Sequence, residues 1–444
     1  MTDTVTGLTV SGGANGTEAR FADLAAMGGV ADGVAADALG VAAAGHRFLL
    51  EPDVLASAVL NPVGVARFEF SMAGALDGPD GLTATSAGIG LRAAALRATE
   101  AAYQAADDLA QSTVDGVRWL AGSVLTSGPL LAGGTGALLF GHAYLAGDGD
   151  PLRWLVEHPG AVDALVGMAP GMLSNLGPKL DLAASMELLG ELYADDPAVV
   201  TGGGLDPAVS GVDVPTGLAD VLTGLDHRND SDSNIDVRLV TDASGAVTGV
   251  IVDIPGTRDW NLPWQPGGAN DTGTNVDAMA GNPTVLQRGI EQALADAYAR
   301  HGVPADTPVM LAGHSQGGIV AAGAADDLIA AGYQVTHVVT AGSPVGRIDV
   351  PDSVRVLSLE NSGDLVPHLD ATDNPGAANR TTVTFDHQTG TPGGNHAIGD
   401  GNYVAAAGEL DGSDDPSVRA FLADTDVFLD GHRVGTYEYL VARG

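Results

Sequence analysis

The chain has 444 residues, 45% of them hydrophobic, which is enough for about two or three domains with buried cores. Its 56 acidic and 19 basic residues give a formal net charge of −37, which argues against binding to nucleic acid or to an anionic lipid surface. Because the chain contains no cysteine, disulfide bonds and thiolate metal sites are excluded.

The first residues, Met1 to Gly7, have neither the basic nor the apolar region of a cleaved secretory signal. The longest run without Asp, Glu, Lys or Arg, residues 119–147, is long enough to span a bilayer. Its glycines, its proline and its polar side chains favour a buried helix pair instead.

Residues 1 to about 118 carry two apolar patterns with a seven-residue step, which is typical of helices that pack lengthwise. The first pattern is Met27, Val34, Val41 and Phe48, with a second seam at Leu24, Ala31 and Ala38. The second pattern is Ile89, Leu96, Tyr103, Ala110 and Val117. The prolines and glycine of residues 51–81 are expected to break helices. We therefore predict an antiparallel helical hairpin within an all-α domain, residues 1–195.

The phrase LRAAALRATEAAYQAAD, Leu91 to Asp107, resembles the small helical-hairpin substrates of type VII secretion in actinobacteria. That family carries a Tyr-x-x-x-Asp/Glu export signal, which Tyr103 and Asp107 match. The resemblance implies a secreted or cell-envelope protein, exported without a cleaved signal peptide, with the secretion machinery as a partner. The alternative is a cytoplasmic chain in which Tyr103 packs inside the hairpin and Asp107 is solvated.

The segment 196–235 is rich in glycine and proline and ends near the polar run Asn229 to Asn234, so we predict a linker with a solvated loop. Apolar runs then alternate with helical patterns over residues 236–444. Strands are predicted at 237–241, 247–254, 309–312, 335–341 and 354–360, and helices at 284–301 and 319–331. This order predicts an α/β domain with a mostly parallel sheet and helices on both faces.

Ser315 lies in Gly313-His314-Ser315-Gln316-Gly317, between an apolar strand and an alanine-rich helix. This G-x-S-x-G pattern is typical of a nucleophile elbow, a sharp strand-to-helix turn that exposes a serine hydroxyl. The turn needs small residues on both sides of the serine, because larger side chains would collide with the crossing backbone. Ser315 is therefore the candidate nucleophile.

An activated serine needs a base and an orienting acid, which follow it in the order acid, then histidine, in this kind of sheet. Asp364 lies just past the carboxyl end of a predicted strand and is favoured over Asp349, Asp352 and Asp370. His396 lies in a glycine-rich loop after the last predicted strand and is the candidate base. The other histidines that follow the elbow closely are His368, the second choice, then His337 and His387.

A developing oxyanion needs two backbone N–H donors, and Gln316, the residue after the nucleophile, supplies one. The second is predicted to be Thr257, because Gly256 allows close approach of the loop after strand 247–254. Trp260 and Trp264 follow that loop. They are expected either to form a wall or lid of an acyl pocket or to make simple packing contacts. These tryptophans and His314 are the predicted substrate-binding residues.

Several ordered phrases within residues 236–410 resemble actinobacterial serine α/β-hydrolases related to the class 3 (fungal-type) lipases and esterases. The phrases are Ile254 to Trp260, Asn275 to Gly281, Gly313 to Gly318, Thr340 to Pro344, Gly363 to Pro367, and His396 with Tyr403. The resemblance implies an α/β-hydrolase fold, Ser315, Asp364 and His396 as a catalytic triad, and Thr257 and Gln316 as oxyanion donors. It implies neither a metal nor another cofactor.

Together these features predict a serine esterase or lipase that hydrolyses an acyl-ester or lipid substrate through an acyl-enzyme. Phospholipase, thioesterase and peptidase activities share the same motif and stay open. So does a non-catalytic type VII-associated interaction protein. The pattern does not specify the acyl-chain length or the oligomeric state.

Overall fold

The computed structural model describes residues 5–13, 21–49, 51–57, 59–78, 81–94, 97, 166, 181–206, 214–229, 234–389, 391–399 and 401–444. By its internal contacts the chain divides into two units. The first, here the sheet unit, consists of Met1–Thr17 and Asp115–Gly444, and the second, the hairpin unit, of Glu18–Val114. Tyr103, Asp107 and residues 119–147 lie outside the described residues.

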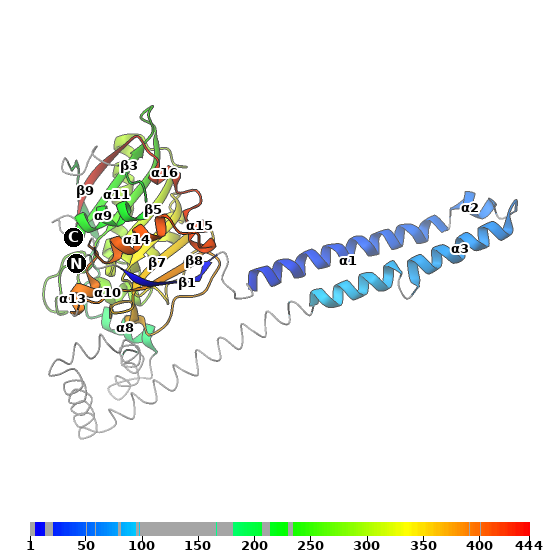
Figure 1. The fold of residues 1–444 in the computed structure, drawn as a ribbon, viewed down its shortest axis with the longest axis horizontal. Coiled ribbons are helices and arrows are strands. Elements are labelled where there is room, and N and C mark those ends of the chain that lie inside the picture. Colours follow the sequence, from blue (N-terminus) through cyan, green and yellow to red (C-terminus); the bar gives the residue numbers. More distant parts are fainter. Residues whose placement is uncertain are drawn as a thin grey trace, which may run out of the picture. The chain divides into compact units, whose positions relative to one another are not determined.

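One nine-stranded sheet organises the described part of the sheet unit, with the strand order β1-β8-β7-β6-β5-β4-β3-β9-β2 (Figure 1). Its central strands, β4 to β8, are all parallel, as the sequence predicted, and antiparallel strands extend both edges. The strands are β1 (Thr6–Gly12), β2 (Ala198–Leu205), β3 (Ile235–Thr241), β4 (Val247–Ile254), β5 (Pro308–His314), β6 (Gln334–Ala341), β7 (Arg355–Asn361), β8 (Arg380–Asp386) and β9 (Arg433–Arg443).

Side chains of the central strands alternate between two buried clusters, one on each face of the sheet. On β4, Val250, Val252 and Ile254 enter one cluster and Ile251 enters the other. The neighbouring strand β5 repeats this alternation. Because both faces are covered, these strands are nearly continuous apolar runs in the sequence.

Helices cover both faces of the sheet. One face is covered by α10 (Thr272–Met279), α11 (Val285–His301) and α12 (Gln316–Ala330). The other is covered by α9 (Leu218–Asn229), α14 (Tyr403–Asp411), α15 (Pro416–Leu422) and α16 (Asp426–Leu429). The shorter helices α8 (Leu182–Gly190), η2 (Pro367–Asp370) and α13 (Pro392–His396) lie in the connections.

The structure corrects two parts of the predicted division into 1–195, 196–235 and 236–444. Residues 6–12, expected to be helical, form β1, which pairs with β8. The expected linker contains β2, which pairs with β9, and the helix α9. These short segments have weak patterns of their own, and partners far along the chain fix their structure.

The hairpin unit also differs from its prediction. It contains α1 (Phe21–Leu49), α2 (Pro52–Ser57), α3 (Pro62–Asp77) and a helical stretch at residues 82–94. The expected breaks are present: α1 ends at Leu49, and Pro52 and Pro62 begin the separate helices α2 and α3. A proline fits the first position of a helix, because the N–H group that it lacks would have no partner within the helix. The Asn61 side chain caps α3 by accepting a hydrogen bond from the Gly64 N–H, with an N···O distance of 2.9 Å.

Small residues form much of the packed face of α1 inside the hairpin unit, beside an edge-on contact of Phe48 with Phe68. Ala42 is buried, Gly45 packs against Leu76, and the Ala35 carbonyl accepts a 2.7 Å hydrogen bond from the Ser86 hydroxyl. The predicted first seam instead faces outward: Met27, Val34, Val41 and Phe48 are 58%, 49%, 59% and 51% exposed. The seven-residue step was correctly found, but the close-packed face of the helix is the alanine and glycine face.

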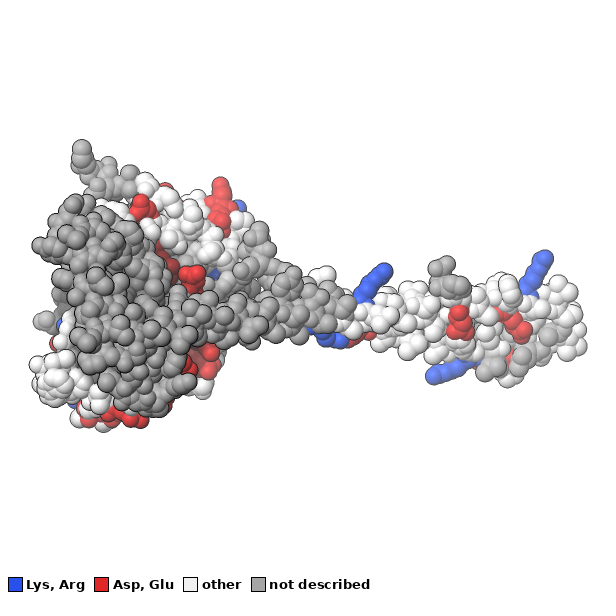
Figure 2. Space-filling view, turned by 90° about the horizontal axis from the view of Figure 1, so that it is seen from below, with Lys and Arg blue, Asp and Glu red and all other residues white. Residues whose placement is uncertain are grey.

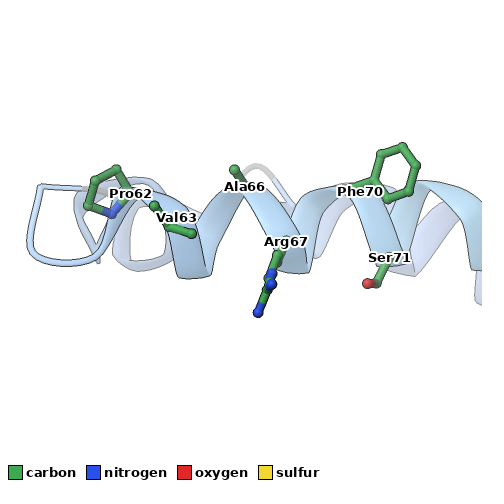
Figure 3. Close-up of a pocket in the computed structure, with 6 residues that line it drawn as sticks. All are labelled: Pro62, Val63, Ala66, Arg67, Phe70 and Ser71. Atoms are coloured by element: carbon green, nitrogen blue, oxygen red, sulfur yellow. The ribbon is translucent and has the colours of Figure 1, made fainter.

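The face of the hairpin unit seen in Figure 2 carries scattered acidic and basic side chains among uncharged ones. A shallow groove on α3 is lined by Pro62, Val63, Ala66, Arg67, Phe70 and Ser71 (Figure 3). Among the described helices, Met27–Leu49 of α1 is long and apolar enough to cross a membrane by length and composition.

Candidate active site

Ser315 lies at the turn between β5 and α12, at the carboxyl edge of the parallel strands. Its φ of 54° and ψ of −122° lie in a region that side chains other than glycine rarely adopt. It is the only residue between Val309 and Ala322 that is not buried. The strained turn therefore exposes one hydroxyl at the end of a buried strand, as a nucleophile elbow does.

The glycines around Ser315 are required by close backbone packing. A Cβ on Gly313 would collide with the Gly317 carbonyl, and a Cβ on Gly317 would collide with the Ile254 carbonyl at the end of β4. A Cβ on Gly318 would collide with the Ser343 hydroxyl. The sequence argument for small residues at this turn therefore has a direct structural basis.

Asp364 follows β7 and is buried, with 1% of its side chain exposed. Its carboxylate accepts hydrogen bonds from His396 Nδ1 at 2.7 Å, from the Tyr403 hydroxyl at 2.7 Å and from the Val366 N–H at 3.0 Å. The rival Asp370 instead accepts bonds from backbone N–H groups, among them that of Gly346. The structure therefore brings Asp364, and not Asp370, to the histidine.

His396 ends α13, and its side chain is 23% exposed, so the ring reaches the surface while its Nδ1 binds the buried carboxylate. The other candidates are held elsewhere. His368 lies in η2, and His337 lies in β6 with its Nε2 next to the Phe421 carbonyl at 3.2 Å. Burial lowers the pKa of His337 to about 4, so this imidazole is neutral at pH 7. His387 donates its backbone N–H to Asn361.

Three buried asparagines, here the asparagine clamp, hold the histidine loop to the end of β7: Asn361, Asn395 and Asn402. The Asn361 amide donates to the carbonyls of His387 and Asn395 at 2.8 and 3.0 Å. The Asn395 amide donates to the Gly363 carbonyl at 2.8 Å, and the Asn402 amide to the Ala397 carbonyl at 2.6 Å. The clamp thus fixes the loops on both sides of the Asp364–His396 contact.

His314 was predicted to bind substrate, but it is only 5% exposed and lies against the histidine. Its Nε2 is 2.9 Å from the His396 carbonyl oxygen, and the two ring centroids are 4.5 Å apart. Burial, and secondly the neighbouring His396, lowers the pKa of His314 to about 3. A neutral imidazole therefore supports the ring of His396, and the substrate-binding role of His314 stays a prediction.

The predicted oxyanion loop lies against the elbow. A Cβ on Gly256 would sit 3.1 Å from the Ser315 Cβ, so the backbone before Thr257 approaches the serine closely. The Thr257 hydroxyl accepts a 2.9 Å hydrogen bond from the Asn275 amide on α10. On the other side, Gln316 is buried, and its side chain donates to the Asp271 carbonyl at 2.7 Å. Both predicted donors are thus tied to the start of α10.

Trp260 and Trp264 lie on the loop between β4 and α10 and are 77% and 78% exposed. The base of this loop is closed by an isolated bridge between Asp259 and Asp271. Packing of the two tryptophans into the core, one of the two predictions, is therefore wrong. Their role as an acyl-pocket wall or lid stays a prediction.

Several residues that support the site were not predicted from the sequence: Tyr403, Asn361, Asn395, Asn402, Asp271 and Arg443. Tyr403 had been noted beside His396 only as part of a resemblance. The asparagines belong to turn-like stretches, in which asparagine is common for reasons unrelated to a site. Among the described residues, no group of three His, Cys, Asp or Glu side chains could hold a metal ion.

A doubly covered parallel sheet with a strained strand–helix elbow, an acid after β7 and a histidine before α14 defines the α/β hydrolase class. A protein-family model described as an alpha/beta hydrolase matches residues 263–406, which include Ser315, Asp364 and His396. The C-terminal half of the chain therefore contains an α/β hydrolase domain, and this membership suggests hydrolase activity. No curated protein and no solved structure matches the chain.

Proposed function

We propose that the sheet unit is a serine hydrolase that cleaves carboxylic esters through an acyl-enzyme. One observation carries the proposal: a buried carboxylate binds the Nδ1 of a partly exposed histidine, at the sheet edge where a strained turn presents Ser315. Serine, acid and histidine follow one another along the chain in the order typical of α/β hydrolases. Family membership supports the hydrolase class, and the ester specificity is our proposal.

In the acylation step, His396 accepts the Ser315 hydroxyl proton at Nε2 while Oγ attacks the ester carbonyl. Asp364 accepts the Nδ1 proton in a hydrogen bond, which fixes the tautomer and stabilises the imidazolium that forms. The N–H groups of Thr257 and Gln316 bind the oxyanion. The C–O bond to the alcohol then breaks, and the alcohol leaves with the proton from His396.

In the deacylation step, His396 accepts a proton from water, and the hydroxide formed attacks the acyl carbonyl. The Ser315 Oγ–acyl bond breaks, Oγ regains its proton from His396, and a carboxylic acid is released. The neutral, buried His314 supports this cycle because it adds no positive charge beside the imidazolium.

The test is Ser315→Ala, assayed with p-nitrophenyl acyl esters and with a fluorophosphonate probe that labels activated serines. We expect loss of both hydrolysis and labelling. Ser244→Ala is the matched control, because Ser244 lies in the exposed turn between β3 and β4. Hydrolysis that survives in Ser315→Ala would refute the proposal. A native protein that is never labelled would favour the non-catalytic alternative, an interaction protein.

Phospholipids and thioesters pass through the same tetrahedral intermediate, so the triad does not choose among them. A panel of esters with short to long acyl chains, beside a thioester and a phospholipid, separates these substrates by kcat/KM. A thioester or phospholipid preferred over every carboxylic ester of matched acyl chain would move the assignment to that alternative.

We further propose that the hairpin unit is recognised by type VII secretion machinery, which would place the protein outside the cytoplasm. The outward-facing stripe of α1 supports this, because large apolar side chains in a seven-residue step fit a helical partner. Tyr103→Ala should reduce the amount of protein in the culture medium of an actinobacterial host. Normal secretion of this variant would contradict the export signal.

A further inference from the structure

Two consecutive residues, Asn270 and Asp271, are hydrogen-bonded to both segments that carry the proposed oxyanion donors. These segments are the loop around Thr257 and the first turn after Ser315. The Asn270 carbonyl accepts hydrogen bonds from the N–H groups of Arg258 and Asp259, at 2.8 and 3.1 Å. The Asn270 side chain donates to the Pro255 carbonyl at 3.3 Å. Asn270 therefore holds the oxyanion loop on both sides of Thr257.

Asp271 makes the corresponding contacts to the elbow and to α10. Its carbonyl accepts the 2.7 Å hydrogen bond from the Gln316 amide, which belongs to the first turn after Ser315. Its carboxylate caps α10 by accepting a 2.9 Å bond from the Thr274 N–H. That cap fixes the helix from which Asn275 binds the Thr257 hydroxyl.

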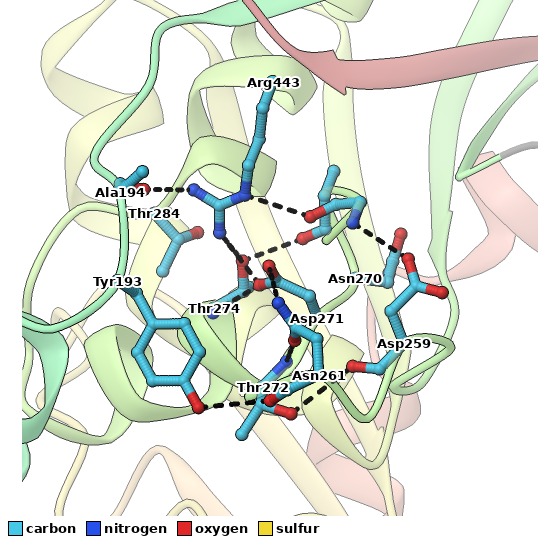
Figure 4. Close-up of polar contacts among 12 residues, drawn as sticks. Tyr193, Ala194, Asp259, Asn261, Asn270, Asp271, Thr272, Thr274, Thr284 and Arg443 are labelled. Carbon is cyan, nitrogen blue, oxygen red and sulfur yellow. Dashed lines mark hydrogen bonds and ion pairs between the residues drawn. The ribbon is translucent and has the colours of Figure 1, made fainter. Parts of the chain in front are cut away.

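The carboxylate of Asp271 is 2% exposed and needs a cation, which Arg443 of β9 supplies at 2.8 Å. The guanidinium also donates to the carbonyls of Gly268 and Ala194, at 3.1 and 2.6 Å. Figure 4 shows Arg443 bonded to Ala194 and to Asp271, and Asn261 bonded to the same Asp271 side chain. The loop, the helix cap and β9 are thus joined at one partly buried ion pair.

We propose that Arg443 and Asp271 are a positioning pair for the oxyanion hole, a role that rests on the proposed hydrolase function. The pair does not contact the acyl group. It sets the spacing of the Thr257 and Gln316 N–H groups, because the carbonyls of residues 270 and 271 bind the oxyanion loop and the Gln316 side chain, respectively. A displacement of about 1 Å at such a site costs about 100-fold in rate, so the pair has a measurable kinetic consequence.

The test is Arg443→Met, which keeps an unbranched apolar stem and removes the charge and the donors of the side chain. Competent sites are counted by fluorophosphonate labelling to completion. We expect kcat per labelled site to fall by about 10- to 100-fold with KM within about 2-fold, because the lost interaction belongs to the transition state. The pH profile of kcat should keep its shape, because the Asp364–His396 contact is untouched. Arg443→Lys should restore part of kcat, since an ammonium group can pair with Asp271 but does not reproduce the planar fork.

Arg288→Met is the matched control. Arg288 also binds a carboxylate and a backbone carbonyl, Asp195 at 2.6 Å and Asp196 at 3.0 Å, but neither belongs to the loop or the elbow. Its kcat per labelled site should equal that of the native protein.

A native kcat per labelled site in Arg443→Met would overturn the proposal, even if the melting temperature fell, because the pair would then only stabilise the fold. If Arg443→Met does not fold, Gln316→Met decides, because it removes the bond to the Asp271 carbonyl and leaves the ion pair intact. Native kcat in Gln316→Met would also overturn the proposal. A native protein that neither hydrolyses esters nor reacts with fluorophosphonate would overturn the proposed function first, and the positioning role with it.

Discussion

The two sides of Ser315 are held by different kinds of bond. On the histidine side, neutral groups hold the loops in place: the asparagine clamp binds backbone carbonyls, and the Tyr403 hydroxyl binds Asp364. On the oxyanion side, the contacts of Asn270 and the cap of α10 are combined with the partly buried ion pair of Asp271 and Arg443.

This difference follows from what each side has to do. The histidine side must carry a proton, and a further charge beside His396 would alter its protonation, so neutral amides are the suitable scaffold. The oxyanion side needs rigid dipoles only, and a paired charge at the start of α10 can hold the chain that carries them. The following predictions test the histidine side, from the largest expected effect to the smallest.

His396→Ala should lower kcat by about 10⁴-fold or more, because the base and the Asp364 contact are lost together. His368→Ala is the control and should keep most of the activity. The measurement is ester hydrolysis per folded protein. The reverse result would reassign the base to His368.

Asn361→Ala should lower the free energy of unfolding by about 2–4 kcal/mol, because buried carbonyls and N–H groups lose their partners. It should also lower kcat by about 100-fold, because the histidine loop shifts relative to Asp364. Asn379→Ala is the control: this amide also donates to two carbonyls, those of Pro351 and Val354, away from the site. Denaturant unfolding and kcat of both variants separate the two effects, and equal kcat losses would refute the clamp's role.

Tyr403→Phe should lower kcat by about 3- to 10-fold, which is about the net free energy of one typical hydrogen bond. Its hydroxyl donates to Asp364 and accepts from the Asn361 N–H. Tyr298→Phe also removes one partly buried hydroxyl, which donates to the Thr307 carbonyl, and should leave kcat unchanged. If the two variants have the same kcat, the Tyr403 hydroxyl does not support the acid.

Glu360→Gln should change the pH dependence of stability with little effect on kcat. Burial, followed by the neighbouring Asp370 and Asp373, raises the pKa of Glu360 to about 8. The folded protein therefore binds more protons than the unfolded chain between the ordinary carboxyl pKa and about 8, so stability falls as pH rises through this window. Melting temperatures between pH 5 and 8 should fall less in Glu360→Gln than in the native protein. The exposed Glu409→Gln is the control, and a native slope in Glu360→Gln would refute the assignment.

The central sheet and the elbow could be predicted from the sequence because their signals are local. Strands buried on both faces are apolar runs, and the glycines around Ser315 are forced by backbone collisions. The burial of His314 could not be predicted, because it depends on the His396 carbonyl, which comes from a distant loop. Asp271 and Arg443 were missed for the same reason.

The hairpin unit shows a different limit of the sequence pattern. A seven-residue step identifies helices that pack on something, but it does not say which face packs on which neighbour. In α1 the small side chains near Ala35 and Ala42 contact the rest of the hairpin, and the stripe that includes Val34 and Val41 stays exposed. The size of the side chains, and not their apolarity alone, therefore determines which seam of α1 packs inside the hairpin unit.

The strand β1 pairs with β8 through contacts such as Thr9 with Thr384, while the whole hairpin unit lies between β1 and the rest of the sheet unit along the chain. During synthesis β1 therefore leaves the ribosome long before its partner strand exists. Contacts this distant in sequence close a very long loop and form late in folding. A shortened protein that starts after the hairpin would leave the β8 edge unpaired and prone to aggregation. Replacing residues 18–114 by a flexible linker keeps β1 and is the better way to obtain the hydrolase domain alone.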